Sequence, residues 1–151
     1  MNKRIIFGDA GYFYIPDAGV RVPLYAKGSR KIAQDTVDAE DSALLASGIN
    51  GGHCAYIADH AAQGFDAIKR CTLGTLAYIV TPNSTRFYIC NAVTEGTNLK
   101  TDLVTLGNER LSRIQWADLC AYCCNDDKGR SISMVFFRAG TRLPYNLFPA
   151  I

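Results

Sequence analysis

A pair of adjacent cysteines and an arginine flank one short polar turn near the C-terminal end of the sequence. Cys123 and Cys124 end the run ADLCAYCC, the turn NDDKG follows, and Arg130 begins the run RSISMVFF. A thiolate is a good nucleophile, but a free thiol is mostly protonated at neutral pH and needs a nearby histidine or cation. A guanidinium can donate to the oxyanion that forms when a thiolate attacks a carbonyl. The pattern therefore indicates a cysteine nucleophile that acts on a carbonyl group.

The missing component is a residue that transfers protons, and the sequence contains two histidines. His53 follows two glycines in INGGHCAY, and such a turn lets backbone and ligand approach closely. His60 stands in ADHAAQGF, just before a predicted helix. A histidine after a glycine turn is more often an ordinary surface residue, so these residues alone leave the choice between His53 and His60 open.

The other cysteines suggest weaker alternatives. The six cysteines are at positions 54, 71, 90, 120, 123 and 124. A chain of this length with this much apolar sequence does not need a disulfide framework, and Cys71 and Cys90 are expected to be buried. Cys120 and Cys123 form a CxxC, but no second CxxC or HxxxH follows at zinc-finger spacing. A redox or metal module around residues 120–124 remains a lesser alternative.

Composition excludes several classes of function. The chain has 151 residues, of which 48% are hydrophobic and 20% charged, which fits one globular domain over residues 1–151. The net charge of +2 comes with no cluster of Lys and Arg, so no nucleic-acid partner is indicated. No apolar run approaches the roughly 18 residues that a membrane-spanning helix needs. Asp9 and two glycines interrupt the N-terminal run MNKRIIFGDAGYF, which is therefore a poor signal peptide.

Short apolar runs rich in Tyr, Phe, Ile and Val recur between turn signals and predict a mainly β protein. The expected strands are residues 4–7, 11–15, 19–25, 53–57, 75–81, 85–94, 118–124 and 131–138. Residues 82–84 and 126–129 are expected to form hairpin turns. Weaker helical signals lie in residues 36–47, 61–70 and 108–116. Many short strands at close spacing are typical of a barrel or a sandwich.

In this order, the motifs resemble those of the sortases, the cysteine transpeptidases of bacterial cell surfaces. IPDAGVRVPLY is similar to a sortase segment in which Ile-Pro and Val-Pro bracket an early strand, and INGGHCAY resembles a stretch ending in Gly-His. QGFDAIKRCTLGTLAYIV resembles the Phe-x-x-Leu helix, glycine turn and strand after the catalytic histidine, and STRFYICNAV the next strand. CAYCCNDDKGRSISMVFF resembles the Thr-Leu-x-Thr-Cys motif with its loop and arginine strand. The resemblance covers about residues 12 to 138.

The resemblance implies a closed β-barrel of about eight strands with short helices. It places Cys124 at the nucleophile position, His53 at the proton-transfer position and Arg130 at the oxyanion or substrate-orienting position. Cys123 replaces the usual threonine before the nucleophile and is expected to point into the core, because side chains alternate along a strand. The chain also lacks the N-terminal anchor common among sortases.

The implied reaction is cleavage of a sorting-type peptide through a thioacyl-enzyme and transfer to an amine or to water. No metal or organic cofactor is required. Calcium binds some sortases, but Glu95 and Asp102 belong to no dense acidic cluster that would support a calcium site. The implied location is a bacterial cell surface. The alternative is a sortase-fold protein without activity that still binds a peptide or a partner.

Overall fold

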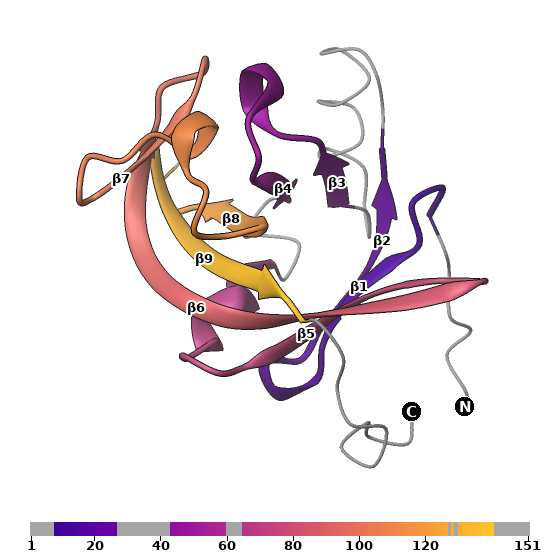
Figure 1. Ribbon diagram of the computed structural model, residues 1–151. Helices are drawn as coiled ribbons and strands as arrows, with labels where there is room; N and C mark the ends of the chain where they lie inside the picture. The colour runs from indigo at the N-terminus through magenta and orange to yellow at the C-terminus, as the bar shows by residue number, and fades with distance from the viewer. Residues whose placement is uncertain (1–7, 27–42, 60–64, 127, 129, 141–151) are drawn as a thin grey trace.

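Nine β-strands and several short 3-10 helices make up the described part of the computed structural model (Figure 1). The structure describes residues 8–26, 43–59, 65–126, 128 and 130–140. The strands are β1 (Tyr12–Ile15), β2 (Val20–Tyr25), β3 (Ala43–Ala46), β4 (Ala55–Ala58), β5 (Leu76–Thr81), β6 (Ser84–Asn98), β7 (Leu103–Thr105), β8 (Leu119–Cys124) and β9 (Ser131–Ala139). The 3-10 helices are η1 (Pro16–Ala18), η2 (Ile49–Gly51), η4 (Phe65–Arg70) and η5 (Leu111–Arg113).

The strands form one sheet that closes on itself. Their order is β5-β1-β2-β3-β4-β8-β9-β6-β7, and a further pairing of β5 with β6 closes eight of them into a barrel, with β7 added at the edge of β6. Two pairings are parallel, β2 with β3 and β4 with β8, and the others are antiparallel. The predicted closed barrel of about eight strands is therefore confirmed.

The barrel interior holds the larger apolar cluster, to which all eight barrel strands contribute. Phe13 is fully buried in this cluster, with its ring centre 6.4 Å from that of Phe65 and 6.2 Å from that of Phe137. Phe65 and Ile68 belong to η4, which packs against β8 and β9. The short helix η4 therefore joins the core of the barrel through its two buried side chains.

A second apolar cluster, called the outer cluster below, lies on the other face of β8 and β9. Its buried members are Cys54, Leu103, Leu111, Ile114, Ala117, Cys120, Ile132, Met134 and Phe136. Leu103 and Leu111 come from β7 and η5, so the segment that follows β6 covers this face, above β8 in Figure 1. The buried carboxylate of Asp102 holds this segment together. It accepts hydrogen bonds from the backbone N–H of Leu103 and from both the N–H and the hydroxyl of Ser112.

Some elements differ from those expected. The run 36–47 is predicted to be helical, but residues 43–46 form β3, between β2 and β4. Pairing on both sides outweighs the helical preference of Ala and Leu. The strand β7 was not predicted, because three residues carry too little pattern. Among the described residues, the helical signals at 61–70 and 108–116 correspond to the short η4 and η5. The expected strand 4–7 lies outside the described residues.

Candidate active site

The thiol of Cys124 lies at the end of β8 and faces outward. The apolar cluster in the barrel interior includes Leu119, Ala121 and Cys123, whereas Cys120 belongs to the outer cluster and Cys124 packs against it. Cys123 is fully buried, and Cys124 is partly exposed. The expected alternation of the two cysteines is confirmed, and Cys124 is the one that a ligand can reach.

Arg130 lies beside this strand end, across the turn between β8 and β9. Cys124 pairs with Ile132, and the N–H of Asn125 donates to the carbonyl of Ser131 at 2.7 Å, so the hairpin stays regular up to the turn. Arg130 stands two residues before Ile132, and such diagonal neighbours lie about 7–8 Å apart at their Cα atoms. The structure therefore brings Cys124 and Arg130 to the same end of one hairpin.

Asp126 organises the turn that joins these two residues. Its carboxylate accepts the backbone N–H of Arg130 at 3.0 Å and that of Ser131 at 3.2 Å. Burial, and after it the negative charge of Asp126, raise the pKa of the Cys124 thiol above its ordinary value of 9.0. In this state the sulfur is a thiol at neutral pH. It becomes a nucleophile only when a base or an approaching substrate removes the proton.

His53 is placed at the opposite end of β8. Its Nε2 and the Oδ1 of Asp118 are 2.5 Å apart, and Asp118 directly precedes β8. The other carboxylate oxygen of Asp118 accepts the N–H of Ala139 at 2.7 Å, at the end of β9. From Asp118 to Cys124 the strand advances six residues, which is roughly 20 Å at about 3.3 Å per residue. The expected meeting of His53 with Cys124 and Arg130 is therefore not found.

The cause is the parallel pairing of β4 with β8. Ala55 pairs with Leu119 and Ala58 with Tyr122, so both strands run in the same direction. A residue just before β4 therefore lies beside the beginning of β8, and the last residue of β4 lies near the end of β8. Asp118 and His53 thus lock the starts of the two strands together. His60, the alternative, lies outside the described residues.

Two tyrosines share the outer face of the barrel with the Cys124 thiol. Tyr56 of β4 and Tyr122 of β8 are partly buried, and their ring centres are 5.9 Å apart. Both pack against the outer cluster, as Cys124 does. Burial raises the pKa of Tyr122 above its usual range, so its hydroxyl stays protonated. The two rings therefore form part of an apolar surface on the face that carries Cys124.

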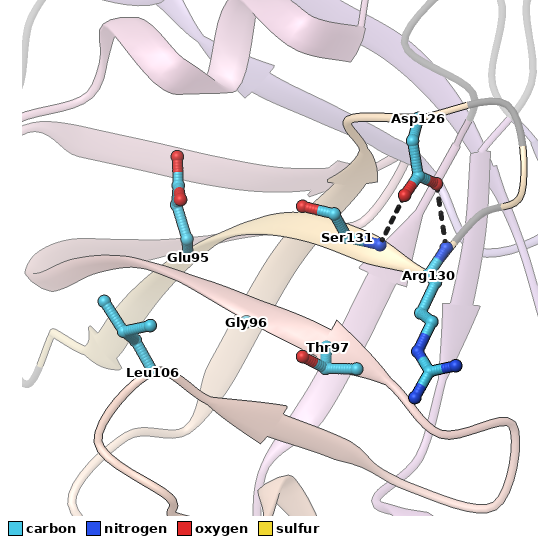
Figure 2. A pocket seen from close by; sticks show the side chains of 7 residues that line it. All are labelled: Glu95, Gly96, Thr97, Leu106, Asp126, Arg130 and Ser131. Atoms are coloured by element: carbon cyan, nitrogen blue, oxygen red, sulfur yellow. Dashed lines mark hydrogen bonds between the residues drawn. The ribbon is translucent and has the colours of Figure 1, made fainter.

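An open pocket of about 360 Å³ lies against the same hairpin (Figure 2). Glu95 and Thr97 of β6 line it, together with Asp126, Arg130, Ser131 and the exposed Leu106. Figure 2 shows Glu95 and Arg130 at opposite ends of this pocket. The pocket was not predicted from the sequence, because it joins residues from three separate segments.

Within the ranges that the structure describes, no group of three or more His, Cys, Asp or Glu side chains is arranged to hold a metal ion. Asp102, considered above as a calcium ligand, is occupied by hydrogen bonds from Leu103 and Ser112. No helix among the described residues is long and apolar enough to cross a membrane.

Comparison with known proteins gives a structural answer. No family model and no curated protein matches the sequence. Among solved structures, sortase C of Clostridium perfringens in complex with the C-terminal cell wall sorting signal motif matches with a TM-score of 0.64 and 15% identity, over 94% of this chain and 71% of that one. Streptococcus pneumoniae sortase C matches with a TM-score of 0.61 and 17% identity, over 88% of this chain and 68% of that one. Sortase C-1 of Actinomyces oris matches with a TM-score of 0.59 and 14% identity, over 87% of this chain and 73% of that one.

These likenesses define the fold. The closed barrel of eight strands, with an added strand on β6, is a sortase fold. Identities of 14–17% show the fold and leave the chemistry to be argued from the residues of this chain.

Proposed function

We propose that the protein is a sortase-like cysteine transpeptidase that cleaves a sorting-type peptide and transfers it to an amine or to water. One observation carries the proposal. In a sortase fold, the partly exposed cysteine of the pair at the end of β8 lies at the same end of the hairpin as Arg130, which directly precedes β9. A nucleophile and an oxyanion donor are thereby available at one strand end.

The steps follow from these positions. The Cys124 sulfur attacks the scissile carbonyl, and the guanidinium of Arg130 donates hydrogen bonds to the oxyanion. The amine leaves with a proton, and a thioacyl-enzyme remains. An incoming amine, or water, then attacks the thioester, and Cys124 regains its proton. This sequence of steps uses no metal or organic cofactor.

The proton-transfer residue must come from the Cys124 end of β8, which argues against His53. We assign this role to His60 from its position in the sequence. His60 follows two residues after Ala58, the last residue of β4, and Ala58 pairs with Tyr122 near the end of β8. His53 is then a residue that fixes the register of β4 against β8 through Asp118.

The peptide is expected to lie on the outer face, next to Tyr56 and Tyr122, where the outer cluster supplies apolar contacts. Sortase C of Clostridium perfringens has been seen with its C-terminal cell wall sorting signal motif, which supports a peptide substrate for this fold. We place the activity at a bacterial cell surface, in line with the resemblance of the motifs to sortases.

The experiment is covalent trapping. The protein is incubated with sorting-type peptides that carry a thiol-reactive group in place of the scissile bond, and the adduct is mapped by mass spectrometry. We expect the adduct on Cys124, and none with Cys124→Ala, which keeps its circular dichroism spectrum. An adduct on Cys54 or Cys71 would remove the assignment.

The roles of the two histidines are distinguished by measuring turnover of a cleavable peptide library with a variant of each. We expect His60→Ala to lower turnover by at least about a hundredfold, the usual contribution of a general acid or base. His53→Ala is expected to act mainly on stability. Loss of turnover with His53→Ala at unchanged stability would restore His53 to the catalytic role.

A specific observation favours one second candidate, an inactive peptide-binding protein. Burial and Asp126 raise the pKa of Cys124, and no described histidine lies near it. If this candidate is right, peptides will bind to the Cys124→Ala and wild-type proteins with equal affinity, and no wild-type thioacyl-enzyme will be detected at any pH.

A further inference from the structure

We propose that Asp126 is a positioning residue of the candidate active site, because its carboxylate binds the backbone on both sides of the Arg130 Cα atom and so directs the guanidinium. This inference rests on the proposed function, in which Arg130 stabilises the oxyanion. It gives a role to a residue of the turn that neither the motifs nor the fold comparison singles out.

The backbone of Arg130 departs from the regular ladder of the sheet. In a regular antiparallel pair, two opposite residues that are hydrogen-bonded exchange both of their N–H and C=O bonds. The carbonyl of Arg130 follows this rule, since it accepts the N–H of Asn98, the last residue of β6, at 2.7 Å. Its N–H instead donates to Oδ1 of Asp126 at 3.0 Å. The carboxylate therefore supplies the acceptor that this N–H does not find in the ladder.

The second oxygen of the same carboxylate binds the next peptide group. Oδ2 of Asp126 accepts the N–H of Ser131 at 3.2 Å. The N–H of Arg130 and the N–H of Ser131 belong to the two peptide groups that flank the Arg130 Cα atom. Hydrogen bonds to a carboxylate are stronger than those between neutral groups. One side chain thus holds both peptide planes, and with them the direction of the Cα–Cβ bond of Arg130.

This arrangement directs the guanidinium to the face of Cys124. Ile132, two residues after Arg130, belongs to the outer cluster, against which Cys124 packs. The carbonyl of Arg130 still lies in the ladder with β6, so side-chain alternation assigns Arg130 to the face of Ile132. Figure 2 shows the carboxylate of Asp126 at the backbone of Arg130 and the guanidinium extending away from it. The positive charge is therefore left for a substrate.

The two effects of Asp126 on the site have opposite signs and can be measured separately. Its negative charge raises the pKa of the Cys124 thiol, so removal of the charge favours reactions of the thiolate. Alkylation by iodoacetamide forms no oxyanion and needs no help from Arg130. Attack on a peptide carbonyl forms an oxyanion and does need it. A positioning role therefore predicts that loss of the carboxylate slows acylation without slowing alkylation.

Single-turnover acylation of Asp126→Ala tests this prediction, with the best-cleaved peptide of the library as substrate. We expect the maximal rate of thioacyl formation to fall about tenfold, since the guanidinium is misdirected and not removed. The half-saturating peptide concentration should change by less than about twofold, because the lost interaction belongs to the transition state. Iodoacetamide should modify Cys124 at least as fast as in the wild type. Slower alkylation together with slower acylation would overturn the inference.

A double-mutant cycle shows whether Asp126 acts through Arg130. In the Arg130→Ala background no guanidinium remains to be directed, so Asp126→Ala should cost less than about twofold more. Asp126→Asn keeps one acceptor oxygen and should give an intermediate rate. Lys128→Ala changes an exposed charge in the same turn and is the control, with acylation within about twofold of wild type. A full further tenfold loss in the double variant contradicts the positioning role.

Hydrogen exchange in the free protein tests the two backbone bonds without catalysis. We expect Asp126→Ala to speed exchange of the Arg130 and Ser131 amides by about tenfold, the usual net effect of one hydrogen bond. The amide of Met134, fully buried in the middle of β9, should be unaffected. Unchanged exchange at Arg130 and Ser131 overturns the inference whether or not the protein is active. Faster exchange with no wild-type thioacyl-enzyme would support the positioning and reject the proposed function.

Discussion

At the scale of single residues, burial separates the six thiols. Burial raises the pKa of Cys54 and of Cys71 to about 12, and that of Cys123 to about 11. The pKa of Cys124 is also raised, but its side chain alone among the six is partly exposed. The position that resembles a nucleophile is thus the position that a reagent can reach.

This difference predicts the order of alkylation. In the native protein at pH 8, iodoacetamide should modify Cys124 before any other cysteine, because the reagent needs both access and thiolate. Peptide mapping after short exposure measures the order. Earlier modification of Cys123 would mean that the two cysteines exchange faces.

Asp126→Asn provides the matched variant for this reaction. Removing the negative charge should lower the pKa of Cys124 and raise its alkylation rate below that pKa, by about twofold for one exposed charge. The amide oxygen can still accept the N–H of Arg130, so the turn keeps one of its two bonds. An unchanged pH profile of alkylation would argue that burial alone sets this pKa.

At the scale of elements, the parallel pair β4 and β8 decides which histidine can serve the site. Local sequence predicts that both segments are strands, and hairpin turns predict antiparallel neighbours, but nothing local states that β4 and β8 lie side by side. Their pairing joins segments about 65 residues apart, as the His53–Asp118 contact does. The resemblance to sortases favours His53 over His60, but the register of β4 against β8 places His53 beside Asp118.

Asp118 should make the stability of this junction depend on pH. The N–H of Ala139, followed by the hydrogen bond from His53, lowers the pKa of Asp118 below its ordinary 3.8, although burial opposes the shift. A carboxyl with a lowered folded-state pKa stabilises the fold above its ordinary pKa, and this contribution is lost as the pH falls through the folded-state value. Asp118→Asn should cost about 1–2 kcal/mol at pH 7.

Urea unfolding at several pH values measures this effect. The difference in unfolding free energy between wild type and Asp118→Asn should shrink as the pH falls from 3.8 through the lowered folded-state pKa of Asp118, because the carboxyl is uncharged below that value. Asp17→Asn, an exposed carboxylate in η1, serves as the control. A difference that stays constant down to pH 2 would show that the charge of Asp118 is not its cause.

At the scale of the whole molecule, the sequence predicts the class of fold and the cysteine end of the site. Most of the strands, the two hairpins and the opposite faces of Cys123 and Cys124 follow from alternation and turn residues. The small strands β3 and β7 and the pocket around Glu95 do not, because each depends on partners distant in the sequence. Closure of the barrel also depends on distant partners. The β5–β6 hairpin joins neighbouring residues, but the pairing of β5 with β1 joins segments far apart in the sequence.

Closure also predicts where a single substitution would act on the entire barrel. Phe13 of β1 touches the rings of Phe65 and Phe137, which belong to η4 and β9 on other parts of the barrel wall. Phe13→Ala should lower the unfolding free energy by about 3–5 kcal/mol, since it leaves a cavity where β1, η4 and β9 meet. Leu73→Ala, at a 71% exposed leucine, should change it by less than about 0.5 kcal/mol.

Chemical denaturation followed by tryptophan fluorescence and by circular dichroism tests this prediction. Trp116 packs on Phe136 with ring centres 4.8 Å apart, on the outer face of the barrel, so its fluorescence reports on a region that Phe13 does not contact. If the barrel unfolds as one unit, both signals should shift to lower denaturant together in Phe13→Ala. A shift in circular dichroism without one in fluorescence would mean that the outer cluster folds independently of the barrel interior.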